Sequence, residues 1–200
     1  MMIMWYNIIN GGYMKKYLLI FILTAIVLTS AAAQQAAQAA PAAEITFNYT
    51  RLTGSASNQF AVWIEDAKGQ HVKTLYATRW TATGGFSRRP TSIPLWVKQS
   101  NLAGAAKEQV DAFSGATPKT GALSFTWDGA NAKGAPVPAG EYTLILEATL
   151  RWENQVYYRA PIRLGQGSAN AQVSVEYTTG ERDTTAERAM IGDVKVRVLR

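Results

Sequence analysis

The sequence contains no cysteine, and this absence excludes several kinds of site. Without a thiol the chain cannot form a disulfide, bind a metal ion through thiolate ligands, carry a lipid on an amino-terminal cysteine or use a cysteine nucleophile. His71 is the only histidine, so neither a zinc site nor a serine–histidine–aspartate triad is expected. The folded chain must therefore be held together by its hydrophobic core.

Charged residues are scarce, at 17% of the 200 residues, whereas 48% are hydrophobic. This composition predicts one globular domain with a sizeable core. The formal net charge is +6, and the basic residues are spread out except at Arg88 and Arg89, so binding of nucleic acid is not expected. The carboxylates are scattered as well. We therefore do not expect an enzyme acting on its own, and a hydrolase has no supporting cluster of residues.

The amino-terminal region has the pattern of an export signal. Residues 1–13 are interpreted as a mis-called upstream start, with the true start at Met14. Residues 14–33 have a lysine pair, an uncharged apolar run and a small-residue cleavage site, which together indicate a Sec-type signal peptide. The apolar run is shorter than the roughly 20 residues that cross a membrane comfortably, and an uncleaved anchor is the alternative. A periplasmic location is predicted.

A spacer separates this signal from the predicted domain. Residues 34–43 are mainly alanine, glutamine and proline without periodicity or charge before Glu44, which indicates a disordered linker. Residues 44–200 are then predicted to form the folded domain.

Within the domain, apolar and polar residues alternate with the period of β-strands. The longest run, 142–150, is expected to be a central strand with one apolar face. Further strands are expected at 45–49, 60–64, 71–76, 125–127, 156–164, 173–177 and 194–198. Residues 78–94 form an irregular connection, and 95–110 contain one or two short helices before the central hairpin. About eight short strands predict an all-β, immunoglobulin-like antiparallel β-sandwich.

The central hairpin is expected between Phe125 and Tyr142, where glycine, proline, asparagine and aspartate provide turn residues. A calcium site at Asp128 and Asn131 is an alternative use of this turn. The stretch F-x-W-D-G, followed by G-x-P-V-P-A-G-x-Y, is similar to the immunoglobulin-like module of the flagellar hook-capping protein and of many secreted bacterial repeats. This resemblance implies a fold and leaves the activity open.

One short polar loop could carry chemistry. It contains Asp111, Ser114, Gly115, Ala116 and Thr117 in the order D-x-x-S-G-A-T. This order resembles the D-x-x-[ST]-G-A-T target of the bacterial flavin transferase, which transfers the FMN half of FAD to the threonine of exported proteins. The resemblance implies covalent FMN on Thr117, with the other four residues as its cofactor-binding surroundings. Gly115 and Ala116 lack bulk, so another protein's active site could approach the backbone. The alternative is a helix-ending loop whose hydroxyls cap or turn the backbone.

Across residues 44–200 the chain resembles a family of predicted periplasmic proteins, domain of unknown function 2271. The residues that carry this resemblance are 61–66, 88–90, 111–118 and the central hairpin. The family shares gene neighbourhoods with flavin-carrying, membrane-linked redox proteins. The resemblance therefore implies a flavin transferase and membrane-linked redox or envelope proteins as partners.

Aromatic and basic residues suggest a possible partner surface. Trp63 falls on the polar face of its strand and is expected to be exposed, near Arg79, Trp80, Arg88 and Arg89. Such a surface could stack on an isoalloxazine ring or a protein partner, or the aromatic residues could simply cover the irregular loop. Two functions stay open: an FMN-carrying flavoprotein of envelope electron transfer, or a non-catalytic periplasmic binding or assembly module without a cofactor.

Overall fold

The computed structural model describes residues 41–54, 56–178, 180 and 185–200, and the predictions made for residues 1–40 lie outside this part of the chain. Two sheets form the domain. The smaller has the order β5 (Gly121–Trp127), β1 (Ala43–Tyr49), β10 (Ile191–Val198) and β8 (Ala169–Ala171). The larger has the order β4 (Ser114–Gly115), β3 (His71–Thr78), β2 (Gln59–Asp66), β6 (Gly140–Arg151), β7 (Asn154–Leu164) and β9 (Ser174–Tyr177). The predicted all-β sandwich is confirmed.

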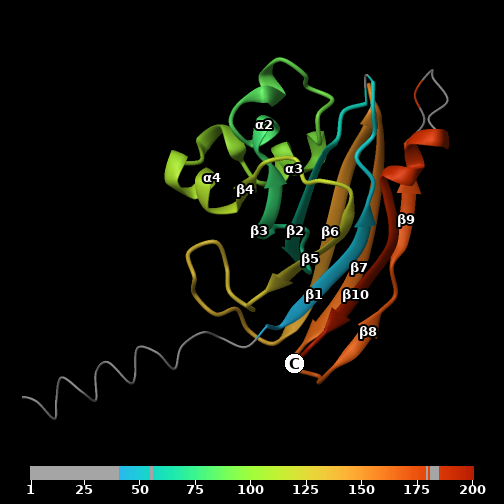
Figure 1. The fold of residues 1–200 in the computed structure, drawn as a ribbon. Coiled ribbons are helices and arrows are strands. Elements are labelled where there is room, and N and C mark those ends of the chain that lie inside the picture. The colour runs from blue at the N-terminus through green and yellow to red at the C-terminus, as the bar shows by residue number, and fades with distance from the viewer. Residues whose placement is uncertain (1–40, 55, 179, 181–184) are drawn as a thin grey trace, which may run out of the picture. The chain divides into compact units, whose positions relative to one another are not determined.

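Short helices connect β3 to β4. They are α2 (Arg79–Ala82), η1 (Gly85–Ser87), α3 (Pro94–Gln99), η2 (Leu102–Gly104) and α4 (Lys107–Phe113). A further short helix, η3 (Thr185–Met190), precedes β10. Figure 1 shows α2, α3 and α4 grouped beside β3 and β2, away from β8 and β9. In the described part of the chain, every helix is too short and too polar to cross a membrane.

A hydrophobic core fills the space between the two sheets. It includes Phe60, Val62 and Ile64 of β2, which pack with residues of β1, β6, β7 and β10. Because successive side chains of a strand point to opposite faces, the residues between these three face outward. The outward residues are nevertheless buried, because a second core lies between the larger sheet and the helices.

Trp63 belongs to this second core, so its predicted exposure is wrong. Its side chain is 0% exposed, and its indole Nε1 donates a hydrogen bond to Glu65 Oε1 at 2.8 Å. It packs in one cluster with Trp96 of α3 and Ile145 of β6. The alternation pattern marks a face as polar or apolar, but it cannot reveal that a layer of helices covers that face.

Glu147 attaches α3 to the sheet. It lies on β6 with 0% exposure, and its two carboxylate oxygens accept hydrogen bonds from the backbone amides of Leu95 (3.1 Å) and Trp96 (2.7 Å). Burial raises the pKa of Glu147 to about 7, although these amides, Tyr157 and Arg159 oppose the shift. Glu147 is therefore a buried anchor for the helical layer.

The predicted central hairpin is also wrong as a strand pairing. β5 pairs with β1 in the smaller sheet, whereas β6 pairs with β2 and β7 in the larger one. The turn chemistry is local: Asn131 N donates to Ala135 O at 2.9 Å, and an isolated bridge joins Ala130 to Pro136. The segment between β5 and β6 therefore crosses from one sheet to the other.

Candidate functional site

The D-x-x-S-G-A-T motif lies at one edge of the larger sheet. Asp111 is in the last turn of α4, and Ser114 and Gly115 form β4, which pairs in parallel with Ala77 and Thr78 of β3. Residues 116–120 then lead to β5 in the other sheet. The motif was expected to be a plain polar loop, but its first three residues end α4 and its next two form a short strand. No periodicity could predict a strand of two residues.

Asp111 forms an ion pair with Arg79. The distance from Arg79 Nη2 to Asp111 Oδ1 is 2.8 Å, and Lys107 Nζ lies 3.9 Å from Asp111 Oδ2. Arg79 directly follows β3, so the β3–β4 pairing brings the two residues together. Both side chains are about half exposed, and such pairs contribute little to stability. The pair does connect the motif to the basic and aromatic segment that begins at Arg79.

Gly115 and Ala116 contact Tyr76. A Cβ atom at Gly115 would lie 2.7 Å from Tyr76 Cε2, so only glycine fits against this ring without movement. The Tyr76 hydroxyl donates a hydrogen bond of 2.8 Å to Ala116 O. Burial raises the pKa of Tyr76 to about 12, which keeps this hydroxyl protonated as a donor. We expected the lack of bulk at Gly115 to leave room for another protein's active site. In the structure, the Tyr76 ring of the same chain occupies this space.

The two motif hydroxyls differ in their surroundings. Within the described residues, Ser114 Oγ is buried without a hydrogen-bond partner. Thr117 is partly exposed, and no hydrogen bond joins its Oγ1 to another described residue. The motif does end a helix, because Ser114 directly follows α4 and its backbone N–H donates to Val110 O, but neither hydroxyl makes a hydrogen bond to the described backbone. Pro118 favours extended backbone at Thr117.

Trp80, Arg88 and Arg89 are exposed, as expected. Trp80 is 40% exposed, and the Arg89 guanidinium carbon lies 5.2 Å from the centre of its ring. Arg89 Nη1 also donates to Ser57 Oγ at 3.2 Å. Arg79 and Trp80 lie next to β4 because α2 follows β3 without a break. Of the predicted partner surface, only Trp63 is absent from the exterior.

A cavity of about 550 Å³ lies between the start of β3, η2 and α4. Its lining includes His71, Thr74, Ser100, Leu102 and Phe113. No sequence pattern predicts it, because segments that are far apart in the chain contribute its walls. His71 and Thr74 would face opposite sides of a regular strand, but the β2–β3 register shifts beside His71 and brings them together.

The cavity contains an ordered chain of hydrogen bonds. Trp96 Nε1 donates to Thr74 Oγ1 at 3.0 Å, and Thr74 Oγ1 lies 2.8 Å from His71 Nε2. Burial lowers the pKa of His71, which favours its neutral ring. The Thr74 hydroxyl has two acceptor lone pairs and one proton, so its bond with Nε2 fits either neutral tautomer of His71.

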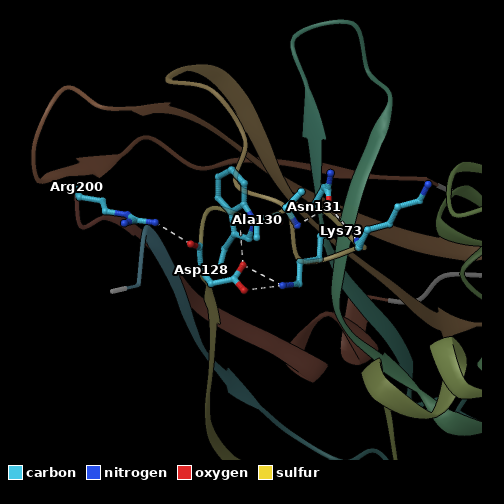
Figure 2. A network of polar contacts seen from close by, with 8 residues as sticks. Lys73, Asp128, Ala130, Asn131 and Arg200 are labelled. Atoms are coloured by element: carbon cyan, nitrogen blue, oxygen red, sulfur yellow. Dashed lines mark hydrogen bonds and ion pairs between the residues drawn. The ribbon is translucent and has the colours of Figure 1, made fainter. Parts of the chain in front are cut away.

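The alternative calcium site is already occupied by a lysine. Figure 2 shows Lys73 reaching Asp128, with its Nζ 2.9 and 2.8 Å from the two carboxylate oxygens. Burial alone would raise the pKa of Asp128, but the hydrogen bonds from Lys73 and Ala130 and the lysine charge together lower it. Arg200 Nη2 donates to Asp128 O at 2.7 Å. No cluster of three or more potential metal ligands occurs in the described ranges.

The comparisons identify a family whose description names no activity. No curated protein sequence matches the chain. The model of a family described as "Predicted periplasmic protein (DUF2271)" matches residues 42–182, which include every strand from β1 to β9 and the motif. The chain therefore belongs to the DUF2271 family of predicted periplasmic proteins.

Proposed function

We propose that this protein carries covalent FMN on Thr117 and serves in an electron-transfer system of the bacterial envelope. The observation that carries the proposal is the position of Thr117. It follows the residues D-x-x-S-G-A, is partly exposed, and has a hydroxyl without a hydrogen bond to any other described residue. It lies outside both hydrophobic cores. An acceptor hydroxyl needs this freedom.

The attachment reaction balances as a transfer from FAD. The Thr117 oxygen forms a bond to the phosphorus of FMN while the bond from that phosphorus to AMP breaks, and AMP leaves. A base must take the hydroxyl proton, because a hydroxyl is a weak nucleophile without one. Asp111 already pairs with Arg79, so we assign the base to the transferase.

The surroundings of Thr117 fit a flavin that is held mainly by its covalent bond. Lys119 is two residues from Thr117, Arg79 follows the β3 residue that pairs with Gly115, and Trp80 offers an exposed aromatic side chain. The 550 Å³ cavity does not include Thr117. A tether keeps its group at high effective concentration without an enclosing pocket. When bound, a flavin supplies one- and two-electron transfer.

Production with and without a flavin transferase tests this function. With the enzyme, the intact protein should gain the mass of FMN less one water and absorb visible light as oxidised flavin. Thr117→Ala should abolish the gain. Thr120→Ala is the matched control, since Thr120 is an exposed threonine in the same segment, and it should gain the full adduct. The absence of any adduct, or one that survives Thr117→Ala, would contradict the proposal.

A second candidate is a non-catalytic binding module, and the 550 Å³ cavity favours it. The cavity combines apolar walls with the His71 imidazole, a combination typical of small-ligand sites. A neutral imidazole in this setting would suit a ligand with an apolar body and one polar group that hydrogen-bonds to the ring. This function needs no flavin, so it is the candidate that a failed attachment test would leave.

A further inference from the structure

We propose that Tyr76 holds the acceptor segment, residues 114–117, against β3, and that FMN is attached when this segment is released. The inference rests on the proposed function for its chemical step. The docking of the segment by Tyr76 can be tested without any flavin.

The first observation is the orientation of the motif. Gly115 faces the Tyr76 ring, where a single added carbon would lie 2.7 Å from Cε2. Ser114 Oγ is buried, and the Asp111 carboxylate is engaged by Arg79. A transferase that approaches the docked segment therefore reaches Asp111, Ala116 and Thr117, but not the Ser114 hydroxyl or the face of Gly115 that lies against Tyr76. Release would expose them together with both sides of the backbone around Thr117.

The second observation is that the attachment of the segment is weak. β4 joins the sheet through two residue pairs only, Ala77 with Ser114 and Thr78 with Gly115, and it lies at the sheet edge. In the described structure the buried Ser114 hydroxyl has no partner, and a buried polar group without a partner disfavours the docked state. Edge segments with few contacts are the ones that open locally.

The third observation is that the Tyr76 ring packs against residues outside the segment. Its ring packs against Phe60 and Phe125, with centroid separations of 5.1 and 4.8 Å. These residues come from β2 and β5, which belong to the two sheets of the sandwich. The Tyr76 hydroxyl is therefore a fixed donor, and Ala116 O is the movable acceptor.

Tyr76→Phe removes the hydroxyl and keeps the ring, so the variant should fold. Loss of one hydrogen bond should raise the released population, and with it the initial rate of FMN incorporation, about two- to tenfold. Amide hydrogen exchange in residues 113–120 should rise by a similar factor without flavin present. Tyr142→Phe is the matched control, because its hydroxyl makes an equivalent 2.8 Å bond to Pro138 O in another loop. It should change neither quantity in this segment.

A disulfide tests the same idea in the opposite direction. Ala77 and Ser114 are direct partners across β3 and β4, and the chain has no other cysteine. The double variant Ala77→Cys, Ser114→Cys should incorporate FMN more slowly when oxidised than when reduced, and the change to the motif at Ser114 is the same in both forms. The reduced protein is its own control for the changed side chains.

The outcomes separate this inference from the proposed function. Faster incorporation in Tyr76→Phe, and slower incorporation in the oxidised than in the reduced double variant, would support it. Incorporation at equal rates in wild type and Tyr76→Phe, and in the two forms of the double variant, would overturn the release step and leave the FMN function intact. Slower incorporation in Tyr76→Phe would mean that the docked segment is the substrate, which also overturns it. No incorporation in any protein would overturn the proposed function itself.

Discussion

Gly115 shows how one missing side-chain atom determines the packing of the proposed acceptor segment. Its backbone has no positive φ, so glycine is not required for conformational reasons. It is required because the Tyr76 ring occupies the space of a Cβ atom. The sequence correctly singled out Gly115 as a position of close approach. It could not reveal that the approaching group belongs to the same chain, because Tyr76 lies far away in sequence.

Gly115→Ala should therefore destabilise the protein by about 1–3 kcal/mol, the usual cost of overpacking. Gly192→Ala is the matched control, since no atom lies within 4 Å of its added carbon and its φ is not positive. This control should change the free energy of unfolding by less than about 1 kcal/mol. Urea denaturation of both variants measures the difference. Equal stability of the two variants would contradict the packing described for Gly115.

At the scale of elements, most strands were predictable from the sequence, but the layer of helices that covers the larger sheet was not. Alternation located the longer strands through their apolar faces, but it missed β4 and β8, which have two and three residues. Trp63 was expected to be exposed, and it lies with Glu147 under the helices between β3 and β4. The cross-sheet segment between β5 and β6 was mistaken for a hairpin for a related reason. Turn residues specify a local reversal, whereas strand pairing depends on which faces the rest of the chain buries.

The attachment of α3 to β6 should depend on pH through Glu147. Its pKa in the folded protein is about 7, above the ordinary value of 4.5, so the folded state binds the proton more tightly than the unfolded state. The resulting stabilisation is complete below about pH 4.5 and is lost as the pH rises towards 7. The free energy of unfolding should fall over this range by up to about 3 kcal/mol.

Glu147→Gln should remove this fall, because the side chain no longer titrates. Glu141→Gln provides the control on the same strand, where an exposed carboxylate pairs with Arg163, and it should retain the wild-type pH profile. Chemical denaturation at several pH values between 4.5 and 7 gives the comparison. A profile in Glu147→Gln that parallels wild type would show that another group is responsible.

At the scale of the whole molecule, the folding unit extends beyond the family match. The match ends at residue 182, but β10 pairs with β1 between Ile191 and Val198. Ile191, Val196 and Val198 are each at most 4% exposed in the core between the sheets. Burial of three aliphatic side chains contributes about 5–9 kcal/mol, which approaches the total stability of many domains.

A chain ending at Met190 should therefore fail to fold, whereas a chain ending at Val198 should remain folded. The longer truncation removes a strand from beside β1, while the shorter one removes only Leu199 and Arg200. Circular dichroism and the cooperativity of thermal unfolding distinguish the two results. Cooperative unfolding of the chain ending at Met190 would show that the sandwich is complete without β10.

The central claim concerns the atom that carries FMN, and site-resolved mass spectrometry tests it most directly. Trypsin cleavage at Lys107 and Lys119 releases residues 108–119, which contain two hydroxyl side chains, Ser114 and Thr117. After production with the flavin transferase, fragmentation should locate the mass of FMN less one water on Thr117. An unmodified peptide, or the added mass on Ser114, would contradict the assignment.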